Sequence, residues 1–237
     1  MLSGQPPIAA RSLRVGGLTP LTTVDWPDRL AAVVFTRGCP WRCPYCHNAE
    51  LRRRDGRSYD WDKVLGFLNT RRGLLDGVVF SGGEPCLQPA LADALAEVRA
   101  LGFATALHTG GNYPERLAGL LDAGLVDWVG LDVKAPWADY PLVTGQPGSG
   151  ERSRRSLRLL LDSGVAHELR TTVWPQVLTP LRLRLVAGQL AALGARNWVL
   201  QPCRLTETAA GAAASAPALQ RLAARIAPDL APVQVRA

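Results

Sequence analysis

The chain alternates two kinds of hydrophobic pattern. Short runs rich in valine and leucine predict buried strands at 31–36, 77–81, 103–109, 127–133, 167–174 and 197–201. Apolar residues at helical spacing predict helices at 61–72, 89–101, 114–123, 151–163, 181–193 and 218–226. A glycine follows most of these predicted helices, as is typical of helix C-termini.

Strands that alternate with helices predict a parallel sheet with crossover helices. Six such units are fewer than the eight of a closed barrel, so we expect an α/β fold, a partial (β/α)6 barrel similar to the TIM barrel, with its chemistry at the carboxyl ends of the strands. We expect one domain over residues 1–237, with a core at about 17–201 and a C-terminal loop and helix at 202–237. The low-complexity segment 206–217 predicts a flexible loop.

Composition restricts where such a protein works. The 237 residues are 47% hydrophobic and 20% charged, without a run of eighteen apolar residues or the apolar segment of a signal peptide. We therefore expect a globular protein without a membrane span. Five cysteines, three of them clustered, do not suit a secreted disulfide framework, so we expect a cytoplasmic location. The net charge is +7, but the arginines are scattered, and we expect no nucleic-acid binding.

Three cysteines with the spacing C-x3-C-x2-C directly follow the first predicted strand: Cys39, Cys43 and Cys46. Their thiolates suit iron, and the tight spacing lets one loop wrap three corners of an iron–sulfur cubane. A closed structural site needs four ligands, so three leave one metal position open. The alternatives are three buried free cysteines, or a zinc site that Cys86 or Cys203 completes.

Other polar groups also lie at predicted strand ends. Ser81-Gly-Gly-Glu-Pro85 ends the second strand, where its two glycines permit unusual dihedrals and close approach to a ligand. Gly130-Leu-Asp-Val-Lys134 ends the fourth strand and places Asp132 and Lys134 on one face, where they could simply pair. Polar residues alternate along 168–172, as in a strand that faces the barrel interior.

The cysteine spacing after the first strand resembles that of the radical S-adenosylmethionine (SAM) superfamily. The resemblance implies a partial barrel of the radical SAM type and a [4Fe–4S] cluster held by Cys39, Cys43 and Cys46. The amine and carboxylate of SAM would chelate the fourth iron, and an electron from the cluster would cleave the sulfonium to a 5′-deoxyadenosyl radical. The substrate itself would then fill the open position.

The same resemblance implies roles for further residues. The GGEP turn is similar to the motif that binds the SAM amine, formed here by Gly82, Gly83 and Glu84. Most relatives have threonine after this turn where this chain has Cys86, which we interpret as a replacement at a helix start. In the D-x-K pattern, Lys134 would contact the SAM carboxylate, and Asp132 would help hold SAM or a nearby cation.

Further resemblances extend this set. The segment Thr23-Val-Asp-Trp-Pro27 is similar to one whose aspartate lies near the reacting site, which makes Asp25 a candidate catalytic residue together with Lys134. His108-Thr-Gly-Gly-Asn112 is similar to a turn that binds SAM or a cation, although His108 could equally be a structural hydrogen-bonding residue. The ring of Tyr45 could cover the adenine or simply pack. The cofactor-binding set that we predict is Tyr45, Gly82, Gly83, Glu84, His108, Thr109, Asp132, Lys134 and Thr172.

Over about residues 17–201, the motifs most resemble the longer class of anaerobic ribonucleoside-triphosphate reductase activating proteins, relatives of pyruvate formate-lyase activating enzymes. This implies a radical SAM oxidoreductase that abstracts a hydrogen from a glycine Cα of a partner, a glycyl-radical enzyme similar to anaerobic ribonucleotide reductase. An acidic flavodoxin or ferredoxin would supply electrons. The alternatives are a radical SAM enzyme for a small molecule, similar to 7-carboxy-7-deazaguanine synthase, and a non-catalytic module that binds an iron–sulfur cluster or zinc.

Overall fold

The computed structural model describes residues 10–203, 216–226 and 233–236. Most of the predicted flexible loop at 206–217 therefore lies outside the described residues. In the described part, no helix has both the length and the apolar character that crossing a membrane requires.

The strands form one curved eight-stranded sheet in which each strand lies beside the next strand along the chain. β1 pairs antiparallel with β2, and all later pairs are parallel. The six predicted strands are confirmed as β2 to β7, whereas β1 and β8 at the two edges were not predicted. The strands are β1 (Val15–Thr22), β2 (Ala31–Thr36), β3 (Gly77–Gly82), β4 (Ala104–Thr109), β5 (Trp128–Asp132), β6 (Ala166–Val173), β7 (Trp198–Pro202) and β8 (Gln234–Val235).

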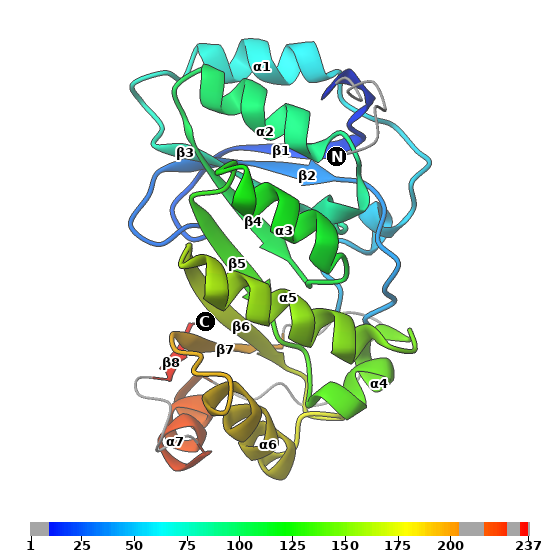
Figure 1. Cartoon of the computed structure of the whole chain (residues 1–237), viewed down its shortest axis with the longest axis vertical. Coiled ribbons are helices and arrows are strands. Elements are labelled where there is room, and N and C mark those ends of the chain that lie inside the picture. The colour runs from blue at the N-terminus through cyan, green and yellow to red at the C-terminus, as the bar shows by residue number, and fades with distance from the viewer. Residues whose placement is uncertain (1–9, 204–215, 227–232, 237) are drawn as a thin grey trace.

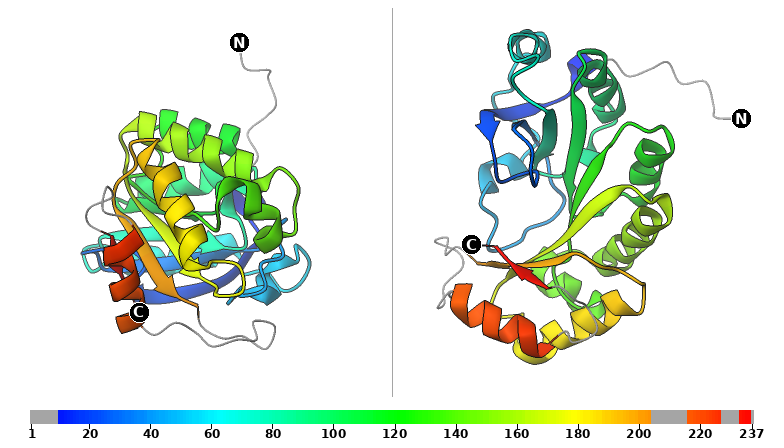
Figure 2. Two further views of the ribbon diagram at one scale, coloured as in Figure 1. Left: turned by 90° about the horizontal axis from the view of Figure 1, so that it is seen from below. Right: turned by 90° about the vertical axis from the view of Figure 1, so that its left-hand side faces the viewer.

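Helices cover the convex face of this sheet and leave its concave side open (Figures 1 and 2). The six predicted helices are confirmed with shifted ends, and the short α4 was not predicted. The helices are α1 (Trp61–Asn69), α2 (Leu91–Ala100), α3 (Pro114–Asp122), α4 (Tyr140–Thr144), α5 (Ser149–Ser163), α6 (Pro180–Ala191) and α7 (Ala216–Ile226). Short 3-10 helices lie at Ala10–Ser12, Ala49–Arg52, Pro85–Leu87 and Trp137–Asp139.

Strand alternation divides the hydrophobic core into two parts. The larger part packs between the sheet and the helices. The smaller part belongs to the concave face and gathers Trp26, Ala31, Val33, Val79, Ala106 and Trp128. Because successive side chains along a strand point to opposite faces, this concave face continues beyond Ala106 to His108 on β4 and beyond Trp128 to Gly130 and Asp132 on β5. Polar residues thus follow the apolar cluster toward the carboxyl ends of the strands.

Candidate active site

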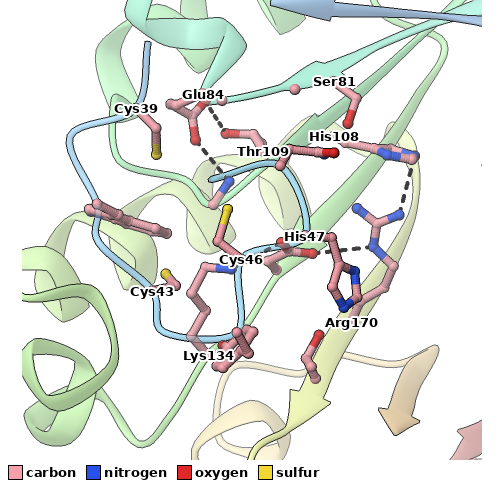
Figure 3. Close-up of a pocket in the computed structure, with 18 residues that line it drawn as sticks. Cys39, Cys43, Cys46, His47, Ser81, Glu84, His108, Thr109, Lys134 and Arg170 are labelled. Atoms are coloured by element: carbon pink, nitrogen blue, oxygen red, sulfur yellow. Dashed lines mark hydrogen bonds and ion pairs between the residues drawn. The ribbon is translucent and has the colours of Figure 1, made fainter. Parts of the chain in front are cut away.

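A pocket lies at the carboxyl ends of the central strands, where the loop that follows β2 faces β3, β4, β5 and β6 (Figure 3). Of the predicted site residues, all but Asp25 line this pocket. They are Cys39, Cys43, Tyr45, Cys46, Gly82, Gly83, Glu84, His108, Thr109, Asp132, Lys134 and Thr172. The topology therefore brings together groups that are more than 130 positions apart in the sequence.

The three cysteines enter the pocket from one loop that is anchored at both ends. Hydrogen bonds from the amides of Gly38 and Cys39 to the carbonyls of Leu51 and Arg52 hold its start, and the Arg42 amide donates to Thr144 in α4. The thiols are largely withdrawn from water, and burial raises the pKa of Cys39 to about 12. A metal that binds here must therefore displace a proton from that thiol.

The two glycines of the GGEP turn let this loop approach the end of β3. Gly82 has a φ of +112°, and a Cβ there would lie 2.4 Å from the backbone of Thr36. A Cβ on Gly83 would lie 2.3 Å from the carbonyl oxygen of Gly38. The amide of Glu84 in turn donates to that oxygen at 2.8 Å. The glycines thus admit the chain's own backbone at the end of β3, and their approach to a ligand stays a prediction.

Glu84 is buried, with 2% of its surface exposed, and its carboxylate joins two loops, its own turn and the loop at the end of β4. Thr109 Oγ1 donates to its Oε1 at 2.7 Å, the Cys86 amide donates to the same oxygen at 3.1 Å, and the Gly110 amide donates to Oε2 at 2.9 Å. Burial nevertheless raises the pKa of Glu84 above its ordinary value. Cys86 lies in the 3-10 helix Pro85–Leu87 and does not line the pocket.

Lys134 and Asp132 pair within the pocket, as the sequence allowed. Lys134 Nζ lies 3.1 Å from Asp132 Oδ2 and also lies over the rings of Trp41 and Tyr45. Burial alone would lower the pKa of Lys134, but nearby groups, chiefly the Asp132 carboxylate, raise it well above its usual value. Burial likewise opposes ionisation of Asp132, yet Lys134 and Arg170 lower its pKa. Both groups are therefore charged at neutral pH.

Arg170 lines the pocket although it was not among the predicted residues. Its Nε lies 3.3 Å from Asp132 Oδ1, close enough for an ion pair but without hydrogen-bond geometry. One signal in the sequence could have identified it, because it alternates with Thr172 on β6, and both side chains face the pocket. Other unpredicted lining residues are Trp41, His47, Asn48, Ser81 and Gly110.

His108 connects the pocket to the loop between β1 and β2. Its Nε2 lies 2.7 Å from the carbonyl oxygen of Asp25 and 3.2 Å from a terminal nitrogen of Arg170. Burial and the Arg170 charge lower the pKa of His108 to about 3, so its ring is neutral. The Asp25 carboxylate instead accepts a hydrogen bond from Thr22 Oγ1 at 2.6 Å. Only the backbone of Asp25 reaches this network.

Tyr45 combines packing with an unused polar group. Its ring packs against Trp174 with centroids 5.9 Å apart, and it is buried. Its hydroxyl group and the indole Nε1 of Trp174 are both buried, and neither has a hydrogen-bond partner among the residues that the structure describes. Buried polar groups normally have partners, so these two donors are consistent with a polar ligand beside the ring.

The donor set fits an iron–sulfur cluster, because three thiols line one pocket and thiolates are the ligands of such clusters. In the described residues, no three His, Cys, Asp or Glu side chains are placed to hold one ion. A cubane spreads its metal atoms, and its ligands lie correspondingly further apart. Neither Cys86 nor Cys203 lines the pocket that contains the three clustered cysteines. These observations give no support to the zinc alternative.

Comparison with known proteins agrees with this geometry. The sequence pattern of the radical SAM superfamily matches residues 33–177. A provisionally named glycyl-radical enzyme activating enzyme of Methanocaldococcus jannaschii, MJ1227, is 31% identical over 172 residues, which cover 69% of this chain and 70% of that protein. Pyruvate formate-lyase-activating enzyme of Clostridium pasteurianum is 34% identical over 148 residues, or 58% of this chain and 59% of that protein.

Solved structures show the same fold. Streptococcus suis SuiB bound to its precursor peptide SuiA has a TM-score of 0.70 at 13% sequence identity. The match covers 86% of this chain and 48% of SuiB. Proteins of the radical SAM superfamily use a [4Fe–4S] cluster and SAM, and one of the similar SuiB structures contains SAM. The chain belongs to the radical SAM superfamily, in the family of glycyl-radical enzyme activating enzymes.

Proposed function

We propose that this protein generates a glycyl radical in a partner enzyme. When bound, the cluster supplies one electron that cleaves SAM to methionine and a 5′-deoxyadenosyl radical. The hydrogen of a glycine Cα on the partner then passes to that radical, which gives 5′-deoxyadenosine and leaves the unpaired electron on the glycine. One electron and one SAM are consumed for each glycyl radical formed.

One observation carries the proposal: the three cysteines of a single loop line the same pocket as Glu84 and Lys134. Cys39, Cys43 and Cys46 would hold three corners of the cluster and leave the fourth iron to SAM. Thiolates suit iron, while a carboxylate and an ammonium suit the charged groups of an amino acid. The pocket therefore offers the ligands for both cofactors side by side.

Specific side chains would hold SAM. Lys134 would bind its carboxylate, and Asp132 would keep that ammonium in place through the 3.1 Å ion pair. Glu84, with the flanking Gly82 and Gly83, would receive the amine of SAM. A carboxylate offers about four lone-pair sites, so its three existing hydrogen bonds leave capacity for one more donor.

Other lining residues would shape the nucleoside end of the site. The ring of Tyr45 would cover the adenine, and its unpartnered hydroxyl would find a polar group there. His108 and Thr109 at the end of β4, and Thr172 on β6, would line the remaining wall. Because the His108 ring is neutral, it would contribute hydrogen bonding rather than charge.

A glycine on a partner protein requires an opening wide enough for a peptide loop. The structure supports this because β1 and β8 lie at opposite edges of the sheet (Figure 2). Beside the pocket, the loop between β1 and β2 exposes 70% of Val24 next to Asp25. We propose that this loop contacts the partner and that Asp25 lies near the incoming glycine.

We further propose that the partner is similar to anaerobic ribonucleoside-triphosphate reductase and that an acidic flavodoxin or ferredoxin donates the electron. The motif resemblance supports the first choice. The net charge of +7 supports the second, because opposite charges steer association. Cytoplasmic partners of this kind also agree with a chain that retains five cysteines outside disulfides.

Electron paramagnetic resonance (EPR) tests the function directly. The protein is reconstituted anaerobically with iron and sulfide, reduced, and mixed with SAM and a candidate glycyl-radical enzyme. We expect a glycyl doublet on the partner and one 5′-deoxyadenosine for each radical. A partner variant in which the radical glycine is alanine should give no doublet.

The same experiment separates the alternatives. SAM cleavage without a doublet on any candidate partner would favour a small-molecule substrate. Binding of zinc alone, without iron and without SAM cleavage, would favour a non-catalytic module and overturn the proposal.

A further inference from the structure

The guanidinium of Arg170 lies beside Asp132, the residue that we expected to help hold SAM or a nearby cation. It crosses the concave face of the sheet from β6 to β5 and contacts Asp132 Oδ1 at 3.3 Å and the Gly130 carbonyl oxygen at 3.4 Å. A carboxylate and a backbone carbonyl are oxygen ligands of the kind that hard cations prefer. Both oxygens here already face a permanent positive charge.

The backbone of β5 is shaped for this side chain. A Cβ on Gly130 would lie 2.7 Å from Arg170 Cζ, and therefore any larger residue at 130 would displace the guanidinium. The strand register supports the same contact, because Gly130 pairs with His108 on β4 and Asp132 pairs with Arg170 on β6. Three neighbouring strands thus hold the guanidinium in one place.

Arg170 nevertheless has more donors than the protein uses. His108 Nε2 lies 2.7 Å from a carbonyl oxygen, which can only accept, so this nitrogen carries the hydrogen and cannot accept from Arg170. In the described part of the chain, the Nε of Arg170 has no hydrogen-bond partner, and the hydrogen bond from Arg170 to the Gly130 carbonyl is long. Only 11% of the side chain is exposed. A guanidinium that is buried with unused donors suits an anionic ligand group.

We propose that Arg170 is the built-in cation of this pocket: its guanidinium occupies the position of a monovalent cation between Asp132 and Gly130 and presents its unused N–H groups to the carboxylate of SAM. This rests on the proposed function only in naming SAM as the ligand. Lys134 reaches Asp132 Oδ2, whereas Arg170 faces Oδ1, so two cations flank one carboxylate and this group of three side chains carries a net positive charge.

The test compares cluster-loaded proteins in potassium and in choline buffers of equal ionic strength. SAM affinity of the wild type should be the same in both. In Arg170→Met, affinity in choline should fall by about tenfold or more, because a charge-assisted contact is lost, and potassium should restore part of it. In Gly130→Ala, the displaced charge should weaken SAM binding without rescue by potassium. Arg99→Met is the matched control, because Arg99 pairs with Asp127 outside the pocket.

A measurement without SAM separates the two proposals. Crystals soaked in thallous ion, a heavy analogue of K+, should show an anomalous peak beside Asp132 in Arg170→Met and none there in the wild type. A peak in the wild type, or SAM binding by the wild type that requires potassium, would overturn the role of Arg170. Absence of SAM binding in every protein, with the thallium result as expected, would overturn the proposed function but leave the built-in cation standing.

Discussion

The Glu84 carboxylate, in the turn after β3, and the Arg170 guanidinium, on β6, line the same pocket but differ in their hydrogen bonding. Glu84 accepts three hydrogen bonds of 2.7–3.1 Å from groups in two loops. Arg170 donates one long hydrogen bond to Gly130 and pairs with Asp132, but within the described residues its Nε has no hydrogen-bond partner. An unsatisfied buried group destabilises a fold. The hydrogen bonds of Glu84 therefore stabilise the loops around the pocket, whereas our proposal is that a ligand completes those of Arg170.

Five predictions test this difference between Glu84 and Arg170. The largest effect concerns the cysteine loop, which faces both groups. Changing Cys39, Cys43 or Cys46 to alanine should abolish iron binding and SAM cleavage, because each would supply one corner of the cluster. Iron content after anaerobic reconstitution and 5′-deoxyadenosine yield are the readouts.

Cys203→Ala is the control for these variants, because Cys203 is buried away from the pocket. It should retain full iron content. Iron retained in Cys43→Ala, or lost in Cys203→Ala, would show that the ligand set is wrong.

The second effect concerns the charged side of the pocket. Lys134→Met should weaken SAM binding by about ten- to a hundredfold, because a charge-assisted hydrogen bond is lost. Equilibrium dialysis with labelled SAM measures this. Lys63→Met is the matched control, because Lys63 is exposed on α1, and it should bind SAM as the wild type does. Unchanged affinity in Lys134→Met would remove Lys134 from the site.

The third effect concerns Glu84, whose carboxylate already accepts three hydrogen bonds. Glu84→Gln replaces an acceptor with an NH2 group that faces existing donors, so the free energy of unfolding should fall by about 1–3 kcal/mol. Urea unfolding measures it. Glu97→Gln is the control, because Glu97 accepts a single bond from Trp61 in the part of the chain that the structure describes, and its loss should be smaller. Equal losses in the two variants would contradict the architectural role of Glu84.

The fourth effect is the pH dependence of stability that His108 causes. Its pKa is about 3 in the folded protein and 6.5 as the ordinary value, so the unfolded chain binds a proton that the folded chain does not. The stability that this group contributes is present above pH 6.5 and is lost as the pH falls toward 3, by about 1.4 kcal/mol for each pH unit.

Unfolding of the wild type and of His108→Gln at several pH values measures this difference. The wild type should lose more stability than the variant on acidification. Arg170→Met should also raise the pKa of His108 as followed by NMR, because a neighbouring positive charge is removed. Parallel pH profiles for the wild type and His108→Gln would contradict the assignment.

The smallest effect removes one donor from Glu84. Thr109→Val deletes the 2.7 Å hydrogen bond but keeps the side-chain shape, so unfolding should become easier by about 1 kcal/mol. Denaturant midpoints are sufficient to measure it. A loss of stability as large as that of Glu84→Gln would mean that this one hydrogen bond, rather than all three together, accounts for the stabilising effect of Glu84.

Much of the fold could be predicted because β2 and β3 are apolar runs and the other parallel strands, apart from the alternating β6, are largely apolar. β1 was missed because the sequence VGGLTPLT contains two glycines and a proline. Apart from one bridge between Val15 and Tyr59, it lies at the edge of the sheet and pairs with β2, and an edge strand tolerates proline. β8 has two residues, too few for any periodic signal.

The site residues that belong to short sequence motifs could be predicted. Arg170 was missed because its place in the pocket depends on how neighbouring strands pair. The cysteine loop and the GGEP turn are local motifs. Arg170 stands beside Glu168 and Thr172 in an alternating strand, and the sequence does not show which charge faces a ligand. Glu168 instead forms a bidentate ion pair with Arg236, 68 positions away, at 2.8 and 2.6 Å. Only the folded structure shows that Arg170 lines the pocket and that Glu168 pairs with Arg236.

The central claim is that Cys39, Cys43 and Cys46 hold a cluster whose fourth iron binds SAM. Electron–nuclear double resonance of the reduced protein with SAM labelled by 15N at the amine and 17O at the carboxylate tests it most directly. The account predicts hyperfine coupling of both labels to the cluster. Absence of both couplings in protein that binds SAM and contains a full cluster would contradict it.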